Sequence, residues 1–309
     1  MKYNKFFLAG SVIAASMTLG SCVGDLDLTP TDPSSLTPGQ FESDPAGYLT
    51  RCIAGVYLQY ATYGANGDAS VQGFDGGMST FQRAVFILEE VPTDEASWIP
   101  NDADYGLFQY GIIPTSNTVV MGTYSRLFIN ISMCNQFIQT VNDGYYHLNT
   151  PELQATADEY IRQARILRAG AYWYAIDNFG NVPYADESVK MGEVAPQLST
   201  DFAEGRRMVY EKVVADLEDV VAWYKQNDPN NRPPYGYVGL DVAESLLVKY
   251  YLNAGVYTGT ENWAKCLEHA EAVIGRLGKG GFKTPVSART ISRTLAPTTR
   301  ISQSAGQTL

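Results

Sequence analysis

The chain has 309 residues, of which 45% are hydrophobic, and its formal net charge is −11 at pH 7. This hydrophobic content suits a packed core and argues against wholesale disorder. The acidic balance argues against a nucleic-acid partner and against electrostatic docking on anionic lipid, because both need clustered Lys and Arg.

Residues 1–21 have the pattern of a secretory signal peptide. Lys2 and Lys5 precede an apolar run from position 6 to 19, which is too short for a permanent membrane span. The following Leu19-Gly20-Ser21-Cys22 has the form of a bacterial lipobox, in which the cysteine thiol accepts the acyl group. We therefore predict that residues 1–21 are removed and that Cys22 carries a lipid anchor. The alternative is an ordinary cleaved signal with a cysteine nearby by chance.

Residues 22–40 are polar and rich in proline, which predicts a flexible leash between the lipid and the fold. Three further cysteines follow at wide spacing, and an odd number so spaced is not a disulfide framework. We expect Cys52, Cys134 and Cys266 to be buried thiols, with one disulfide possible in an oxidising compartment.

The first half of the remaining chain alternates helices with irregular loops. An amphipathic stripe opening at Asp44-Pro45 predicts a helix, and apolar spacing predicts another over 118–141. Residues 62–80 are rich in glycine and residues 98–114 are loop-like, whereas 81–97 are ambiguous.

The second half is more regular and predicts four helices, over 151–179, 201–225, 241–257 and 262–276. Gly180 is expected to stop the first of them, and Thr200 or Asp201 to cap the second. The last two form a helix–turn–helix unit of tetratricopeptide type, although an ordinary pair of antiparallel helices explains the pattern equally well. The predicted fold class is all-α.

Residues 280–309 differ from the rest of the chain. They are basic and rich in Ser and Thr, and every acidic residue lies at or before Glu271. We interpret this tail as disordered or as read out of frame.

Two segments carry a family resemblance. They are RQARILRAGAYWYAIDNFGNVPY at 162–184, and the lipobox cysteine followed by an acidic leash and the helix around TRCIAGVYLQY at 50–60. Together they resemble the SusD/RagB family of Bacteroidetes outer-membrane lipoproteins. The resemblance extends to about residue 282. Because members of that family continue further, 41–279 is interpreted as a SusD-like helical domain that is incomplete at its C-terminus.

The resemblance implies a scaffold of tetratricopeptide-like helix pairs with irregular ligand-binding loops. It also implies a lipid-anchored, non-enzymatic protein at the cell exterior that captures oligosaccharides for a SusC-like TonB-dependent transporter. Peptide capture, as in some members, and a role as a helical-repeat assembly module are the alternatives. A glycosidase using a carboxylate pair is a third; the acidic residues considered for it are Glu89, Glu90, Asp94 and Glu95.

The resemblance places ligand contacts in the loops after the first helix. Sugar rings need flat aromatic platforms and side-chain amides or carboxylates that reach their hydroxyl groups. We predict Trp98 and Tyr105 as platforms and Asp75 and Asn101 as hydroxyl partners, with Phe74 a weaker candidate. The alternative for Trp98 is simple packing against the helices.

Several other residues have structural explanations. Trp173 and Trp223 are expected in the core and Trp263 between paired helices. Arg165 and Arg168 are expected to pair with carboxylates such as Asp216 or Glu218. We expect no cofactor and no metal site: HExxH and CxxC motifs are lacking, and the oxygens of 101–104 lack the glycine and glutamate of an EF-hand loop.

Overall fold

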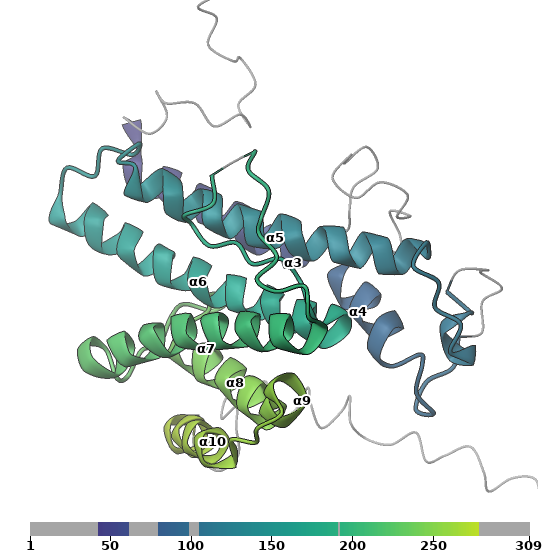
Figure 1. Ribbon diagram of the computed structural model, residues 1–309. Helices are drawn as coiled ribbons and strands as arrows, with labels where there is room; N and C mark the ends of the chain where they lie inside the picture. The colour runs from purple at the N-terminus through teal and green to yellow at the C-terminus, as the bar shows by residue number, and fades with distance from the viewer. Residues whose placement is uncertain (1–42, 62–79, 99–104, 191, 278–309) are drawn as a thin grey trace, which may run out of the picture. The chain divides into compact units, whose positions relative to one another are not determined.

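The computed structural model describes residues 43–61, 80–98, 105–190 and 192–277 (Figure 1). Every regular element in these ranges is a helix, which confirms the predicted all-α class. The chain divides into two compact units between Arg51 and Cys52. The predictions for the signal peptide, Cys22, the leash, the glycine-rich segment 62–79 and the tail from 278 lie outside the described residues.

The described part of the first unit is the beginning of helix α3, Pro45–Ala61. The Asp44 side chain accepts a hydrogen bond from the Gly47 amide at 3.0 Å, and the Asp44 carbonyl accepts one from the Tyr48 amide at 2.9 Å. The side-chain bond satisfies an amide that the first helical turn leaves without a partner. The predicted helix start at Asp44-Pro45 is therefore confirmed.

The second unit is a succession of packed helices. Helices α5 (Thr118–Asn142), α6 (Pro151–Phe179) and α7 (Phe202–Asn227) lie side by side in chain order. The shorter helix α4 (Phe81–Glu89) packs on α5, and α8 (Leu240–Leu252) packs on α7 (Figure 1). The segment 81–97, ambiguous by sequence, is thus a helix followed by turns.

Local capping explains where the three long helices begin. The side chains of Asn117, Thr150 and Asp201 each accept a hydrogen bond from an amide in the first turn, at 2.9, 3.2 and 2.8 Å. Such caps are worth about 1 kcal/mol each. The helices predicted over 118–141, 151–179 and 201–225 are confirmed, with Asp201 as the cap of the last.

Small residues on α6 allow its neighbours to approach closely. Four alanines on its packing face are all buried: Ala157, Ala164, Ala171 and Ala175. Tyrosine rings fill much of the surrounding core, and their hydroxyl groups donate to specific acceptors. Tyr172 donates to the Ala185 carbonyl at 3.1 Å, and Tyr224 donates to Glu159 at 2.7 Å. The core can therefore use tyrosine without leaving these hydroxyl groups unpaired.

Gly180 ends α6, as predicted, and only glycine fits there. Its φ is +73°, and a Cβ at this position would overlap the ring of Phe202. The chain then turns into the segment 181–201, where Asn181 donates to the Ser199 carbonyl at 2.9 Å and Val182 is buried. This turn brings residues 185–190 back against α5 and α6.

The prediction of a single helix over 241–257 is wrong in one respect. The helix is interrupted at Asn253, so that α8 (Leu240–Leu252) is followed by the short α9 (Ala254–Thr258). The Asn253 amide still bonds to the Lys249 carbonyl, but its backbone has left helical geometry, with φ −100° and ψ 11°. Helix α10 (Trp263–Leu277) then packs against α8, which gives the predicted helix pair.

Charged groups link helix α10 to α7 and α8. His269 is fully buried, with Nδ1 3.4 Å from Glu244 on α8 and Nε2 3.2 Å from Glu218 on α7. Glu244 is also fully buried and contacts Lys225 at 2.9 Å as well as Arg276. A buried carboxylate shared by three cationic or hydrogen-bonding groups fixes the position of the helix, because each group needs its partner once water is excluded.

This cluster makes stability depend on pH in the acid range. Burial alone would raise the pKa of Glu244, but hydrogen bonds from His269, Arg276 and Lys225 outweigh it and lower the pKa to about 2. A carboxyl group whose pKa is lowered on folding stabilises the fold when the pH is above 4.5, its usual pKa. This stabilisation is lost as the pH falls toward about 2.

We therefore expect the free energy of unfolding to fall between about pH 5 and about pH 2, and Glu244→Gln to flatten that fall. The measurement is the urea midpoint as a function of pH. Glu211→Gln is the matched control, because Glu211 is exposed and pairs with neighbouring Arg207 on the same helix. If the wild type and Glu244→Gln lost stability with the same pH profile, this assignment would be wrong.

Cys134 is buried, whereas Cys52 and Cys266 are only partly so, and no disulfide joins any two of the three. Burial raises the pKa of the Cys134 thiol to about 12, which keeps it protonated and unreactive. Among the described residues, no helix combines the length and the apolar character needed to cross a membrane.

Candidate ligand-binding site

The predicted platform Trp98 lies on a small packed lobe formed by α4 and the segment that leads to α5. The core of this lobe is apolar and buried: Ala84, Ile87, Val91, Tyr105, Phe108 and Val119. A 3₁₀ turn at Phe108–Tyr110 ends at Gly111, whose φ of +67° lets the chain reverse toward the Asn117 cap. Tyr105 and Phe108 thereby attach the segment before α5 to helix α4.

Trp98 itself is partly buried. Its ring lies 5.7 Å from the Tyr105 ring at 36°, and the Arg83 guanidinium lies 5.9 Å from the indole centroid. The indole Nε1 is buried and has no hydrogen-bond acceptor within the described part of the chain. The structure thus brings the two predicted aromatic residues together, with Trp98 packed on the lobe and still partly accessible.

Tyr105 is buried beneath Trp98, with 9% of its surface exposed. In this position its ring supports the indole and offers little face of its own. The other predicted contacts, Phe74, Asp75 and Asn101, lie outside the described residues, as does the 101–104 segment considered for Ca²⁺. Their part in the site stays a prediction.

Sequence reasoning missed a group of exposed aromatic and aliphatic side chains on the same loop. Tyr110 is 72% exposed, and Ile112 and Ile113 are also exposed. Nearby, the Ser97 hydroxyl lies 3.3 Å from Gln109 and bridges the two arms of the loop. The only sequence signal was the loop-like composition of 98–114, which does not distinguish an exposed ring from a buried one.

The acidic residues considered for a glycosidase are spread over different environments. Burial raises the pKa of Glu89, which accepts a hydrogen bond from Asn178 at 2.9 Å. Asp94 and Glu95 are exposed, and Glu90 is partly so. Glu89 is thus tied to α6, while the two later carboxylates face solvent.

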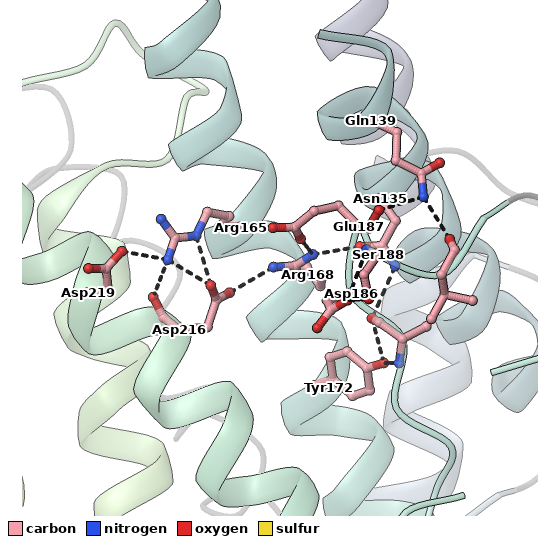
Figure 2. Close-up of polar contacts among 12 residues, drawn as sticks. Asn135, Gln139, Arg165, Arg168, Tyr172, Asp186, Glu187, Ser188, Asp216 and Asp219 are labelled. Atoms are coloured by element: carbon pink, nitrogen blue, oxygen red, sulfur yellow. Dashed lines mark hydrogen bonds and ion pairs between the residues drawn. The ribbon is translucent and has the colours of Figure 1, made fainter. Parts of the chain in front are cut away.

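An ionic network joins α5, α6, α7 and the 185–190 segment (Figure 2). Arg168 reaches Glu187 at 2.5 Å, Asp216 at 3.0 Å and Asn135 at 2.6 Å, while Arg165 contacts Asp216 at 2.7 Å. The predicted structural pairing with Asp216 is confirmed.

Of the two carboxylates named as possible partners, the arginines contact Asp216. Glu218 instead accepts a hydrogen bond from Tyr251 and contacts His269. Asp216 and Glu218 are two residues apart on α7, so they face different neighbours.

The tryptophans expected in the core or between paired helices divide into two groups. Trp173 is buried, as predicted. Trp223 is 37% exposed and stacks against Arg162, and Trp263 is 53% exposed and donates its indole hydrogen to Glu261. Both of these predictions are wrong, because apolar spacing along one helix does not reveal whether a neighbour covers that face.

Three comparisons bear on the family. Residues 97–235 match the model of the SusD-like family described as "Starch-binding associating with outer membrane". The curated Starch-binding protein SusD of Bacteroides thetaiotaomicron is 30% identical over 279 residues, which are 89% of this chain and 46% of that protein. The chain therefore spans about half the length of this relative.

A solved structure supports the same relationship at the level of the fold. The crystal structure of a SusD homolog from Bacteroides thetaiotaomicron matches 77% of this chain and 42% of its own, with a TM-score of 0.53 and 18% identity. The matched family region contains Trp98, the part of its lobe from Tyr105 onward and the 162–184 segment. From its helical architecture, its matched region and its relative, this chain belongs to the SusD-like family, whose description places its members at the outer membrane.

Proposed function

We propose that this protein captures oligosaccharides at the outer membrane and presents them to a SusC-like TonB-dependent transporter. The printed description of the family and the name of its starch-binding relative support glycan as the ligand class. Anchoring through lipidated Cys22, with the domain facing the cell exterior, is part of the same proposal and rests on the lipobox sequence.

The observation that best supports this function is the packing of the Trp98 ring on Tyr105 and the apolar lobe. A sugar ring binds by laying its C–H face on an indole, and the gain is greatest when the indole does not have to be ordered on binding. Tyr105 and the apolar lobe hold the Trp98 ring in place, and Arg83 lies beside it. A rigid aromatic group with polar neighbours is the usual composition of a small-molecule site.

We expect Trp98→Ala to weaken glycan binding about tenfold or more, because truncating a hot-spot aromatic residue costs about 2 kcal/mol or more and about 1.4 kcal/mol corresponds to tenfold. The measurement is affinity electrophoresis of the purified full-length chain through gels containing amylopectin, xylan, mannan or laminarin. Trp263→Ala is the control, since Trp263 is an exposed tryptophan on α10.

Equal retardation of Trp98→Ala and wild type on the retained glycan would contradict the proposed site. A folding defect is recognised separately, since it would also lower the helical circular dichroism. Release of reducing ends from a retained glycan would point to a glycosidase instead.

One observation favours a second candidate function, protein–protein assembly. Helix α10 exposes three large apolar side chains, those of Trp263, Leu267 and Ile274. These positions are spaced to lie along one side of the helix, as expected of a surface that packs on another helix. Absence of retardation on every glycan, together with self-association or partner binding lost in Leu267→Ser, would favour assembly.

A further inference from the structure

A groove of about 330 Å³ runs between α6 and α7, and it shares no residue with the Trp98 lobe. Its main side chains come from one face of each helix: Asp158, Arg162 and Arg165 on α6, and Asp219, Trp223 and Gln226 on α7. From Asp219 to Gln226 the helix rises about 10 Å. This length suits a short oligosaccharide better than a single ion.

The indole of Trp223 forms the middle of the groove. The Arg162 guanidinium lies 3.4 Å from the ring centroid and covers one face, while the Tyr224 ring meets the indole edge-on at 5.4 Å. More than a third of Trp223 is nevertheless exposed. The ring is therefore held by Arg162, which also lines the groove, and part of the residue stays accessible.

Arg162 is itself fixed, because it also pairs with Glu159 at 3.0 Å. A guanidinium stacked on an indole stabilises it by cation–π attraction, worth about 0.5–1 kcal/mol at an exposed site. The ordered ring is consequently available without a large entropic cost on binding.

Polar groups flank the indole along the groove. One oxygen of Asp158 accepts from Gln154 at 2.8 Å, and one oxygen of Asp219 accepts from Arg165 at 2.8 Å. The Gln226 amide, which is exposed, has no hydrogen bond within the described part of the chain. Each carboxylate thus keeps a second oxygen, and the amide both of its atoms, for a ligand.

The charges of the groove balance. Two guanidinium groups and two carboxylates line it, so neither a strongly anionic nor a strongly cationic ligand gains from entering. An exposed flat ring between carboxylate and amide groups fits the C–H face and the hydroxyl groups of an uncharged sugar.

We propose that the α6–α7 groove is a second carbohydrate subsite, which binds neutral pyranose rings by stacking on Trp223 with Asp219 and Gln226 as hydroxyl partners. The ligand class rests on the proposed function. Two separated subsites on one chain would raise the affinity for long glycans above that for short ones, because the second contact becomes intramolecular.

The test uses the four tryptophans as separate reporters. The purified full-length chain, labelled with ¹⁵N, is titrated with maltoheptaose, laminarihexaose, xylohexaose and mannohexaose, and the indole signals are assigned from single Trp→Phe variants. We expect the Trp223 signal to shift with at least one of these sugars while the Trp263 signal does not. Trp223→Ala should weaken the corresponding binding about fivefold or more, and Trp223→Phe less.

The outcomes separate this subsite from the Trp98 site. A shift of Trp98 without Trp223 overturns the subsite and leaves the proposed function intact. A shift of Trp223 without Trp98 supports the subsite and contradicts the loop site. A parallel titration uses a tryptic peptide pool. The proposal is overturned if the Trp223 signal shifts with none of the four sugars, or if it shifts only with the peptides.

Discussion

Replacing Arg168 with methionine is expected to lower the free energy of unfolding by about 3 kcal/mol. The Arg168 side chain is only 3% exposed, and it contacts Glu187, Asp216 and Asn135. Burial opposes its charge, but the two carboxylates outweigh this and raise its pKa above the usual range. Methionine fills the space without the charge, so Asn135 and Glu187 lose their buried partner.

Urea unfolding followed by circular dichroism measures this loss. Arg207→Met is the matched control, because Arg207 is exposed and its pair with Glu211 on the same helix is worth about 0.5 kcal/mol or less. Similar losses in the two variants would show that the buried network contributes no more than a surface ion pair.

The Arg168 network also explains how residues 185–190 are held. Tyr172 and Asn135 both donate to the Ala185 carbonyl, and Gln139 donates to the carbonyls of Glu187 and Val189 (Figure 2). These contacts anchor an irregular segment to two helices. In Arg168→Met we therefore expect amide exchange to accelerate first in this segment.

The second large effect is expected for Tyr250→Ala, which should lower the free energy of unfolding by about 3–5 kcal/mol. Tyr250 is fully buried on α8, its ring lies 5.8 Å from that of Tyr210, and its hydroxyl donates to the Ala169 carbonyl at 2.7 Å. Alanine would leave a cavity where α6, α7 and α8 meet.

Tyr250→Phe separates the ring from its hydroxyl group. It keeps the packing and removes only one hydrogen bond, so we expect a loss of about 1 kcal/mol. Both variants are compared by urea unfolding. A loss in Tyr250→Phe as large as that in Tyr250→Ala would mean that the hydroxyl, and not the ring, holds the helices together.

The segment that carries the family resemblance is mainly scaffold. Within 162–184, Arg165 and Arg168 form the network, Tyr172 and Trp173 are buried, and Gly180 makes the turn. Arg162 is different, because its guanidinium stacks on a ring that faces a groove. The residues that identify the family are therefore largely different from those proposed to contact the ligand.

Local signals in the sequence determined where most helices begin and end. The Asp201 cap, Pro151 in the first turn of α6 and the Gly180 stop each act within a few residues, so they could be read without the fold. The pairing of Arg165 and Arg168 with Asp216 was also predictable, because two arginines on an apolar helix need a carboxylate once they are buried.

Only the tertiary structure decided which faces of these helices are covered. Trp223 and Trp263 are exposed although their spacing resembles that of core residues, while His269 is fully buried. Burial depends on which helix packs alongside, and that contact joins residues far apart in the sequence. For the same reason the Arg162–Trp223 stack, formed between α6 and α7, could not be read from either helix alone.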